Sequence, residues 1–208
     1  MRTAALGLAL VSVIGILAAQ QRGHAEQEVA QQSDQGVTSR EFTLSADPTV
    51  KVLHIAYIPV TSRRETHLSL FGDGRFLVET TDRKGNVLEQ ASTNFSFGET
   101  RALVDLALSH GLADSTSAEI MAKVKETLPA GEGGASLPDD AGTVIIALEL
   151  EEYVHGSERT SPFSTQVALG EPKILHLIAP SIDEVTGFVK LSERLLPIRK
   201  QLLEGGSN

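Results

Sequence analysis

Two carboxylates, a phenol and an imidazole occupy alternate positions in the stretch LELEEYVHG. They are Glu149, Glu151, Tyr153 and His155. Alternate residues of an extended strand point to the same side, so these four side chains would share one face. Such a face could bind a divalent cation or carry out acid–base chemistry. The alternative is the solvated face of a half-buried antiparallel sheet, where polar residues are expected.

Two further carboxylates, Asp139 and Asp140, lie in a segment rich in Gly, Pro and Asp that predicts a long loop. Either could serve as a metal ligand beside the strand face. A metal-dependent or acid–base hydrolase that uses Glu149, Glu151 and His155 is therefore one functional hypothesis.

Motifs for other chemistries are missing from the sequence. The histidines are scattered singly, without the H-E-x-x-H spacing of zinc enzymes. There is no G-x-S-x-G or S-x-x-K motif for a serine nucleophile, and no G-x-G-x-x-G fingerprint for a dinucleotide. The chain contains no cysteine, which excludes disulfides and thiol chemistry. We therefore expect no cofactor and favour a non-catalytic binding or scaffolding domain over an enzyme.

The stretch LSLFGDGRFLVE places Asp73 between Gly72 and Gly74. A metal-binding loop would need further oxygen ligands nearby, but the apolar alternation resumes directly after Arg75. Asp-Gly between two alternating runs is a strong signal for a β-hairpin, because a tight turn requires residues that tolerate positive φ. We therefore expect a turn here.

Alternating and β-branched residues predict a series of antiparallel strands. Residues 41–44 could add a short strand before them, and residues 173–179 are compatible with either a strand or a short helix. The predicted strands are residues 50–60, 66–72, 75–81, 86–92, 143–156 and 162–170.

Three helices are predicted from a repeated N-terminal signature, a Ser or Thr followed three residues later by Glu. The pairs are Ser96 with Glu99, Thr116 with Glu119, and Ser181 with Glu184. Each pair precedes apolar residues at helical spacing. Pro197 is expected to kink or end the third helix. The predicted fold is α+β, an antiparallel meander sheet of about five to seven strands with about three helices packed on one face.

The N-terminal region resembles an export signal. Arg2 precedes an apolar run at residues 4–19, and small residues at Gly23 and Ala25 suit cleavage after Ala25. Residues 26–47 are polar and predict a flexible spacer, and we expect residues 48–205 to form a single domain. We expect a periplasmic or secreted protein. In the alternative, residues 4–19 stay attached as an anchor and the protein is a membrane-anchored accessory subunit.

The net charge of −9 and the aromatic content of 4% argue against a nucleic-acid partner, because no basic patch is expected for phosphates. Membrane contact is expected only if the N-terminal segment is retained. The partner is unknown, and another envelope protein is one candidate.

The order of elements resembles small exported bacterial domains of unknown function. The resemblance is carried by the first hairpin, in which alternating hydrophobic residues lead into G-D-G at residues 72–74. It extends over residues 52–196 as an order of strands and helices. Those domains often carry a cysteine before the hairpin, and this chain has none. The resemblance implies an envelope location and an α+β fold, and it implies no activity.

Overall fold

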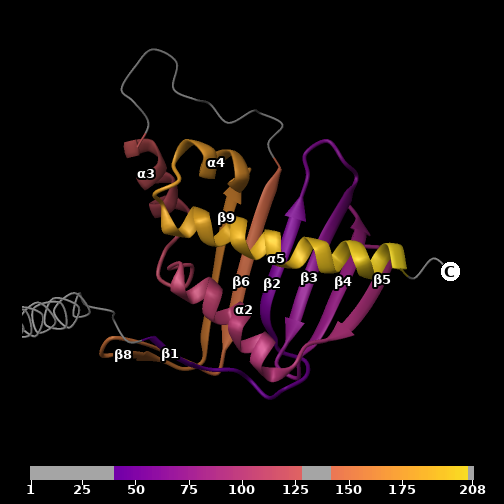
Figure 1. Ribbon diagram of the computed structural model, residues 1–208, viewed down its shortest axis with the longest axis horizontal. Coiled ribbons are helices and arrows are strands. Elements are labelled where there is room, and N and C mark those ends of the chain that lie inside the picture. Colours follow the sequence, from indigo (N-terminus) through magenta and orange to yellow (C-terminus); the bar gives the residue numbers. More distant parts are fainter. Residues whose placement is uncertain (1–39, 128–141, 206–208) are drawn as a thin grey trace, which may run out of the picture. The chain divides into compact units, whose positions relative to one another are not determined.

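The computed structural model describes residues 40–127 and 142–205. This part of the chain forms an antiparallel six-stranded sheet, a smaller three-stranded sheet and four helices, which confirms the α+β class (Figure 1). In spatial order, the strands of the large sheet are β5 (Val87–Asn94), β4 (Arg75–Asp82), β3 (Arg64–Phe71), β2 (Lys51–Ile58), β6 (Thr143–Leu150) and β9 (Phe163–Gly170).

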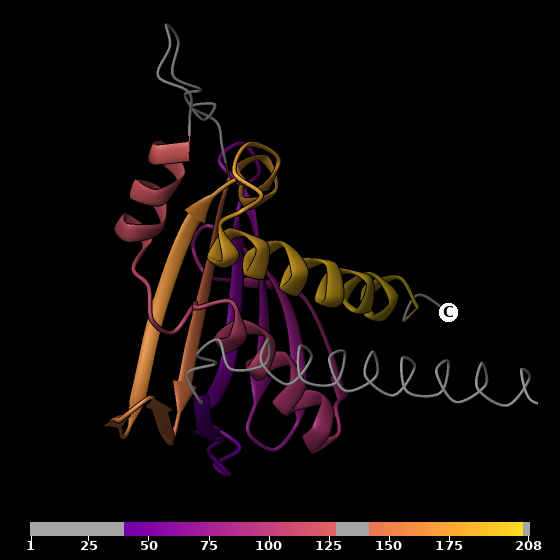
Figure 2. The ribbon, with the colours of Figure 1, turned by 60° about the vertical axis from the view of Figure 1, so that its left-hand side comes forward.

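Helices α2 and α5 lie on the same side of the large sheet, and α5 crosses its strands (Figures 1 and 2). The short helix α4, for which the sequence allowed strand or helix, packs against α5. Helix α3 lies beside the edge strand β9, where Ser117 Oγ accepts a hydrogen bond from the Ala168 amide at 2.8 Å. The helices are α2 (Phe97–Ser109), α3 (Ser117–Thr127), α4 (Pro172–Ile178) and α5 (Asp183–Gly205).

The core lies between the large sheet and its helices. Leu53 on β2 is paired with Leu70 on β3 and with Leu148 on β6, and all three side chains are buried. Helix α5 adds Phe188 and Leu195 to the same apolar cluster. The alternation of apolar residues therefore defines the covered face of the sheet, as expected for an antiparallel sheet with one buried side.

The predicted strand at residues 143–156 is wrong as a single element. β6 ends at Leu150, and β7 (Glu152–His155) belongs to the smaller sheet with β1 (Arg40–Thr43) and β8 (Glu158–Thr160). The chain leaves the large sheet at Glu151, whose amide donates to the Thr43 carbonyl at 3.0 Å. The consecutive glutamates Glu151 and Glu152 interrupt the alternation here, but the sequence pattern does not show that the next residues pair in another sheet. β1 falls inside the stretch predicted as a spacer and corresponds to the short strand that was allowed for at residues 41–44.

Two of the three predicted helix caps are confirmed. The Ser96 and Thr116 hydroxyls accept from the amides of Glu99 and Glu119, whose carboxylates accept from the capping residues in return. The third box is wrong, because the Glu184 carboxylate instead accepts from Ser115 and pairs with Lys123 of α3.

Two further predictions concern local backbone. The hairpin at G-D-G is confirmed, since Gly74 has a φ of +89° and Asp73 Oδ1 accepts from the Arg75 amide at 3.0 Å. Helix α5 continues past Pro197 to Gly205 rather than ending there. In the part of the chain that the structure describes, no helix combines the length and apolar character that crossing a membrane requires.

Candidate ligand-binding site

The structure separates the residues that the sequence placed on one strand face. Glu149 and Glu151 are exposed and line a hollow of about 580 Å³ together with Ser161 and Ser164. His155 belongs to the smaller sheet and contacts a different carboxylate. Of the proposed hydrolase residues, the two glutamates are therefore brought together and the histidine is not. The other candidate ligands, Asp139 and Asp140, lie outside the described residues.

Asp114, in the connection between α2 and α3, is the centre of a polar cluster. Its carboxylate accepts from the Tyr153 hydroxyl at 3.0 and 3.1 Å, and it lies 3.2 Å from His155 Nδ1 and 3.5 Å from the Arg40 guanidinium. Arg40 also donates to the Leu108 carbonyl at 2.7 Å. These contacts join the smaller sheet to the C-terminal end of α2, so the cluster has a structural use.

Burial is the main cause that raises the pKa of Tyr153, and the hydrogen bond to Asp114 and its negative charge raise the pKa further. The Arg40 charge opposes this increase. The Tyr153 phenol therefore stays protonated at neutral pH and acts as a donor.

His54 of β2 and His67 of β3 lie next to each other across neighbouring strands. Their rings are stacked with centroids 5.6 Å apart, and His54 Nδ1 lies 3.0 Å from Ser69 Oγ. Burial, Lys51 and His67 lower the pKa of His54 to about 4. Among the described residues, no group of three or more His, Asp or Glu side chains is arranged to hold a metal ion.

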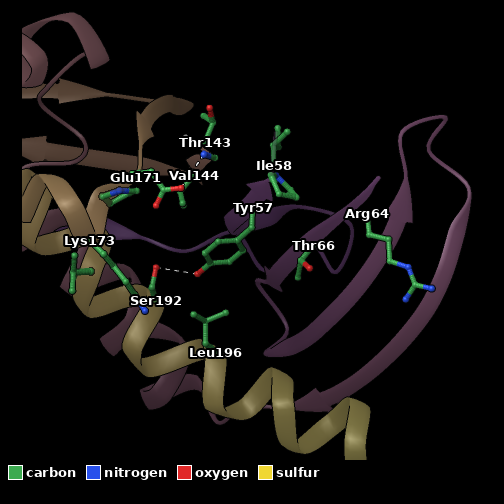
Figure 3. Close-up of a pocket in the computed structure, with 14 residues that line it drawn as sticks. Tyr57, Ile58, Arg64, Thr66, Thr143, Val144, Glu171, Lys173, Ser192 and Leu196 are labelled. Carbon is green, nitrogen blue, oxygen red and sulfur yellow. Dashed lines mark hydrogen bonds between the residues drawn. The ribbon is translucent and has the colours of Figure 1, made fainter. Parts of the chain in front are cut away.

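A cavity of about 310 Å³ opens between the large sheet and helices α4 and α5 (Figure 3). Tyr57, the last core-facing residue of β2, lies in its middle. Sites for small molecules are typically concave, apolar and equipped with a few polar groups, and their volumes begin at about 300 Å³. The apolar walls of the cavity around Tyr57 come from the sheet, α4 and α5. They comprise Ile58, Pro59, Val144, Pro172, Val189 and Leu196.

The polar centre of this cavity is a pair of hydroxyls. Tyr57 donates a hydrogen bond to Ser192 Oγ of α5 at 3.0 Å, as the dashed line in Figure 3 shows. Burial raises the pKa of Tyr57, while the bond to Ser192 and the nearby charge of Arg199 oppose that change. At neutral pH, Tyr57 is therefore a protonated donor rather than a base.

The rim of the cavity is shaped by Glu171, which has a φ of +43°. A residue other than glycine rarely adopts this left-handed conformation, which costs of order 1 kcal/mol and is concentrated at functional sites. Two hydrogen bonds to Gly142, which directly precedes β6, hold Glu171 in this conformation. The Glu171 amide donates to the Gly142 carbonyl, and the Glu171 carboxylate accepts from the Gly142 amide, both at 2.9 Å.

Two cationic side chains complete the lining. Lys173 lies on the same side of Tyr57 as Ser192, and Arg64 lies at the opposite end (Figure 3). Arg64 is 3.6 Å from the Glu89 carboxylate, and both side chains of this pair are more than half exposed. Water screens such a pair, so it contributes little to stability.

The sequence interpretation missed this cavity, although two residues carried a signal for it. Tyr57 continues the core-facing series of Leu53 and Ile55, and a buried tyrosine requires a partner for its hydroxyl. Ser192 lies at a buried position of the apolar face of α5. The sequence does not show that Tyr57 and Ser192 are partners, because 135 positions separate them in the chain.

Comparison of the sequence with protein-family profiles and with characterised proteins finds no match.

Proposed function

We propose that this chain is an exported envelope protein whose folded domain binds a small molecule, without catalysis, in the cavity around Tyr57. The observation that carries the proposal is the cavity itself, in which apolar walls surround one pair of hydroxyl groups. The left-handed backbone of Glu171 at the rim supports it, because such strain is retained where it shapes a site.

Binding accounts for these side chains better than catalysis does. A general base must be able to accept a proton near neutral pH, and a nucleophile requires such a base beside it. The Tyr57 hydroxyl donates to Ser192, and burial raises the pKa of Tyr57. The Glu171 carboxylate accepts from the backbone of Gly142. These groups can recognise and orient a ligand, but they are not arranged to transfer its protons.

The proposal is tested with Nile red, a neutral apolar dye whose fluorescence increases in an apolar environment. Leu196→Trp, which fills the cavity, should weaken dye binding by about tenfold or more, since the loss of an apolar contact region costs at least 1.4 kcal/mol. Leu88→Trp is the matched control, because Leu88 is exposed on β5 and does not line the cavity.

Both tryptophan variants must first give the circular dichroism spectrum of the parent chain. Dye binding that is unchanged in Leu196→Trp, or equally weakened in Leu88→Trp, would contradict the proposal. The parent chain contains no tryptophan, so the introduced indole also serves as a fluorescence reporter at each position.

Export is the second part of the proposal, and it is supported by the apolar run at residues 4–19 and the small residues before position 26. N-terminal sequencing of protein recovered from the producing cell's envelope tests it. A mature start at Glu26 is expected. An intact N-terminus in the membrane fraction would favour the membrane-anchored accessory subunit instead.

The hydrolase alternative would now have to rely on His155 and Asp114, whose contact resembles the carboxylate–imidazole pairs that orient a general base. Glu149 and Glu151 line a different hollow. Hydrolysis of generic ester or phosphate substrates that disappears in His155→Gln would favour this alternative over binding.

A further inference from the structure

We infer that the ligand is an anionic amphiphile, an acid whose carboxylate lies near Lys173, Ser192 and Tyr57 and whose apolar body extends along Leu196. This inference rests on the proposed function and adds the chemical class of the ligand and its orientation. It follows from the charge of the lining, from a hydroxyl proton that the protein leaves unused, and from the apolar walls.

The charge of the cavity lining is opposite to that of the whole chain. The chain has a net charge of −9, whereas the lining contains two cations, Arg64 and Lys173, and one acid, Glu171. The Glu171 carboxylate is already engaged by the Gly142 amide. Cationic groups beside low-dielectric walls attract and retain anions, even when the protein as a whole repels them.

The two cations differ in their availability. Arg64 is paired with Glu89 at 3.6 Å. Within the described ranges, Lys173 has no carboxylate within ion-pair distance, and its side chain is exposed. An ammonium group at the rim can therefore accept an incoming anion without breaking an existing pair. This difference favours the Lys173 end of the cavity for the acidic group.

The hydroxyl pair supplies a second donor at this end. Tyr57 donates its proton to Ser192 Oγ, so the Ser192 hydroxyl can still donate its own proton. In the residues described, Ser192 Oγ has no other hydrogen-bond partner than Tyr57. A carboxylate oxygen beside Ser192 would extend the chain from Tyr57 to Ser192 to the ligand. Hydrogen bonds to an ionised acceptor are about twice as strong as neutral ones.

The remaining walls determine the rest of the ligand. Beyond the hydroxyl pair, the cavity is lined by Val144, Val189 and Leu196, with Thr66 as its inner polar residue on the sheet. A volume of about 310 Å³ lies at the small end of the range for ligand sites, so the cavity suits a compact ligand rather than a large cofactor. An apolar body attached to one acidic group matches this arrangement.

The test compares octanoate with octan-1-ol, which has the same chain without the charge, and with inorganic phosphate, which has charge without the chain. Binding is measured by calorimetry and by displacement of Nile red. Octanoate should bind about tenfold more tightly than octan-1-ol, since one charge-assisted hydrogen bond and one nearby cation are worth at least 1.4 kcal/mol. Inorganic phosphate should not bind.

Three variants locate the acidic group. Lys173→Met should weaken octanoate binding about tenfold and leave octan-1-ol binding unchanged. Ser192→Ala should weaken octanoate binding about threefold, because it removes one donor. Lys200→Met, which removes an exposed lysine of α5 that does not line the cavity, is the control for net charge and should have no effect.

The outcomes separate this inference from the proposed function. Equal binding of octanoate and octan-1-ol, both weakened by Leu196→Trp, would overturn the anionic ligand and retain the binding function. Loss of octanoate binding in Arg64→Met rather than in Lys173→Met would overturn the assigned orientation.

Absence of octanoate binding together with sedimentation on phosphatidylglycerol vesicles would overturn the inference in favour of a bilayer surface. Dye binding unaffected by Leu196→Trp would overturn the function itself.

Discussion

The chain has two tyrosines, and they occupy contrasting environments. Tyr153 is buried and donates to the Asp114 carboxylate, which also contacts Arg40 and His155. Tyr57 is half-buried and donates to the neutral hydroxyl of Ser192 beside an open cavity. Burial raises the pKa of both phenols.

A structural tyrosine can be distinguished from one at a binding site by the hydrogen-bond partner of its hydroxyl. At Tyr153, the phenol donates its only proton to the Asp114 carboxylate, so this hydroxyl has no proton left to donate to a ligand. At Tyr57, the phenol donates to Ser192, and the proton of the Ser192 hydroxyl remains available beside the apolar walls of the cavity. Of the two tyrosines, Tyr153 should therefore matter more for stability and Tyr57 more for ligand binding.

The largest effect is expected from Asp114→Ala, which leaves the buried Tyr153 hydroxyl without its acceptor and removes the carboxylate that contacts Arg40 and His155. We expect a loss of about 3 kcal/mol in the free energy of unfolding, measured by urea denaturation with circular dichroism. Asp105→Ala, which removes an exposed carboxylate of α2, should change this free energy by less than about 0.5 kcal/mol. Equal effects of the two substitutions would contradict a special role for the cluster.

Tyr153→Phe removes one donor but leaves Asp114 in contact with Arg40 and His155. Its expected cost is about 2 kcal/mol, in the range for a hydrogen bond to a charged group, measured in the same urea experiment. A double-mutant cycle with Asp114→Ala should show strong coupling, because Tyr153 and Asp114 share that bond. Additive effects would show that the contact between Tyr153 and Asp114 contributes little.

Tyr57→Phe should cost less than about 1 kcal/mol in the free energy of unfolding, since it removes a bond between two neutral groups at the margin of the core. Its effect should instead be visible in octanoate binding, because the chain of donors through Ser192 is interrupted. If Tyr57→Phe destabilised the protein more than Tyr153→Phe, the distinction between the two tyrosines would be reversed.

Alkaline titration has the smallest expected effect on the folded protein and none at neutral pH. A raised folded-state pKa means that each tyrosine contributes its full stability below the ordinary value of about 10 and loses that contribution as the pH rises through the folded-state pKa. Tyr153 has the larger shift. Tyrosinate absorbance should therefore appear at higher pH in Tyr57→Phe, which retains Tyr153, than in Tyr153→Phe.

Much of the large sheet could be predicted from sequence, because its first four strands are joined by short connections. The alternation around Asp73 and Gly74 determines both the turn and the face of each neighbouring residue. The capping boxes at Ser96 and Thr116 are also local and were predicted correctly. Such features depend on neighbours within a few residues, which the sequence displays directly.

The predictions that were wrong concern features that depend on residues far away in the chain. Ser181 and Glu184 have the spacing of a capping box, but Lys123 and Ser115 offer the Glu184 carboxylate stronger partners. Burial alone would raise the pKa of Glu184, and the contacts from Lys123 and Ser115 outweigh it and lower the pKa. Periodicity likewise could not show that the chain changes sheets at Glu151.

The candidate site was missed for the same reason. Its residues come from β2, β3, β6, α4 and α5, and each of them fits an ordinary structural role when it is considered alone. Only the packing of α5 across the sheet brings Ser192 to Tyr57. A site assembled in this way has no sequence motif, even when two of its members are polar residues at core positions.

The pairing of β1 with β7 has a consequence for the order in which the protein folds. β1 is the first of the described strands to be synthesised, yet its partner lies more than a hundred residues later, with Phe42 opposite Tyr153. The meander from β2 to β5 needs only local contacts, which form faster than distant ones. We therefore expect the strand that is made first to be fixed in place last, in the step that also completes the cluster around Asp114, because Arg40 of β1 belongs to that cluster.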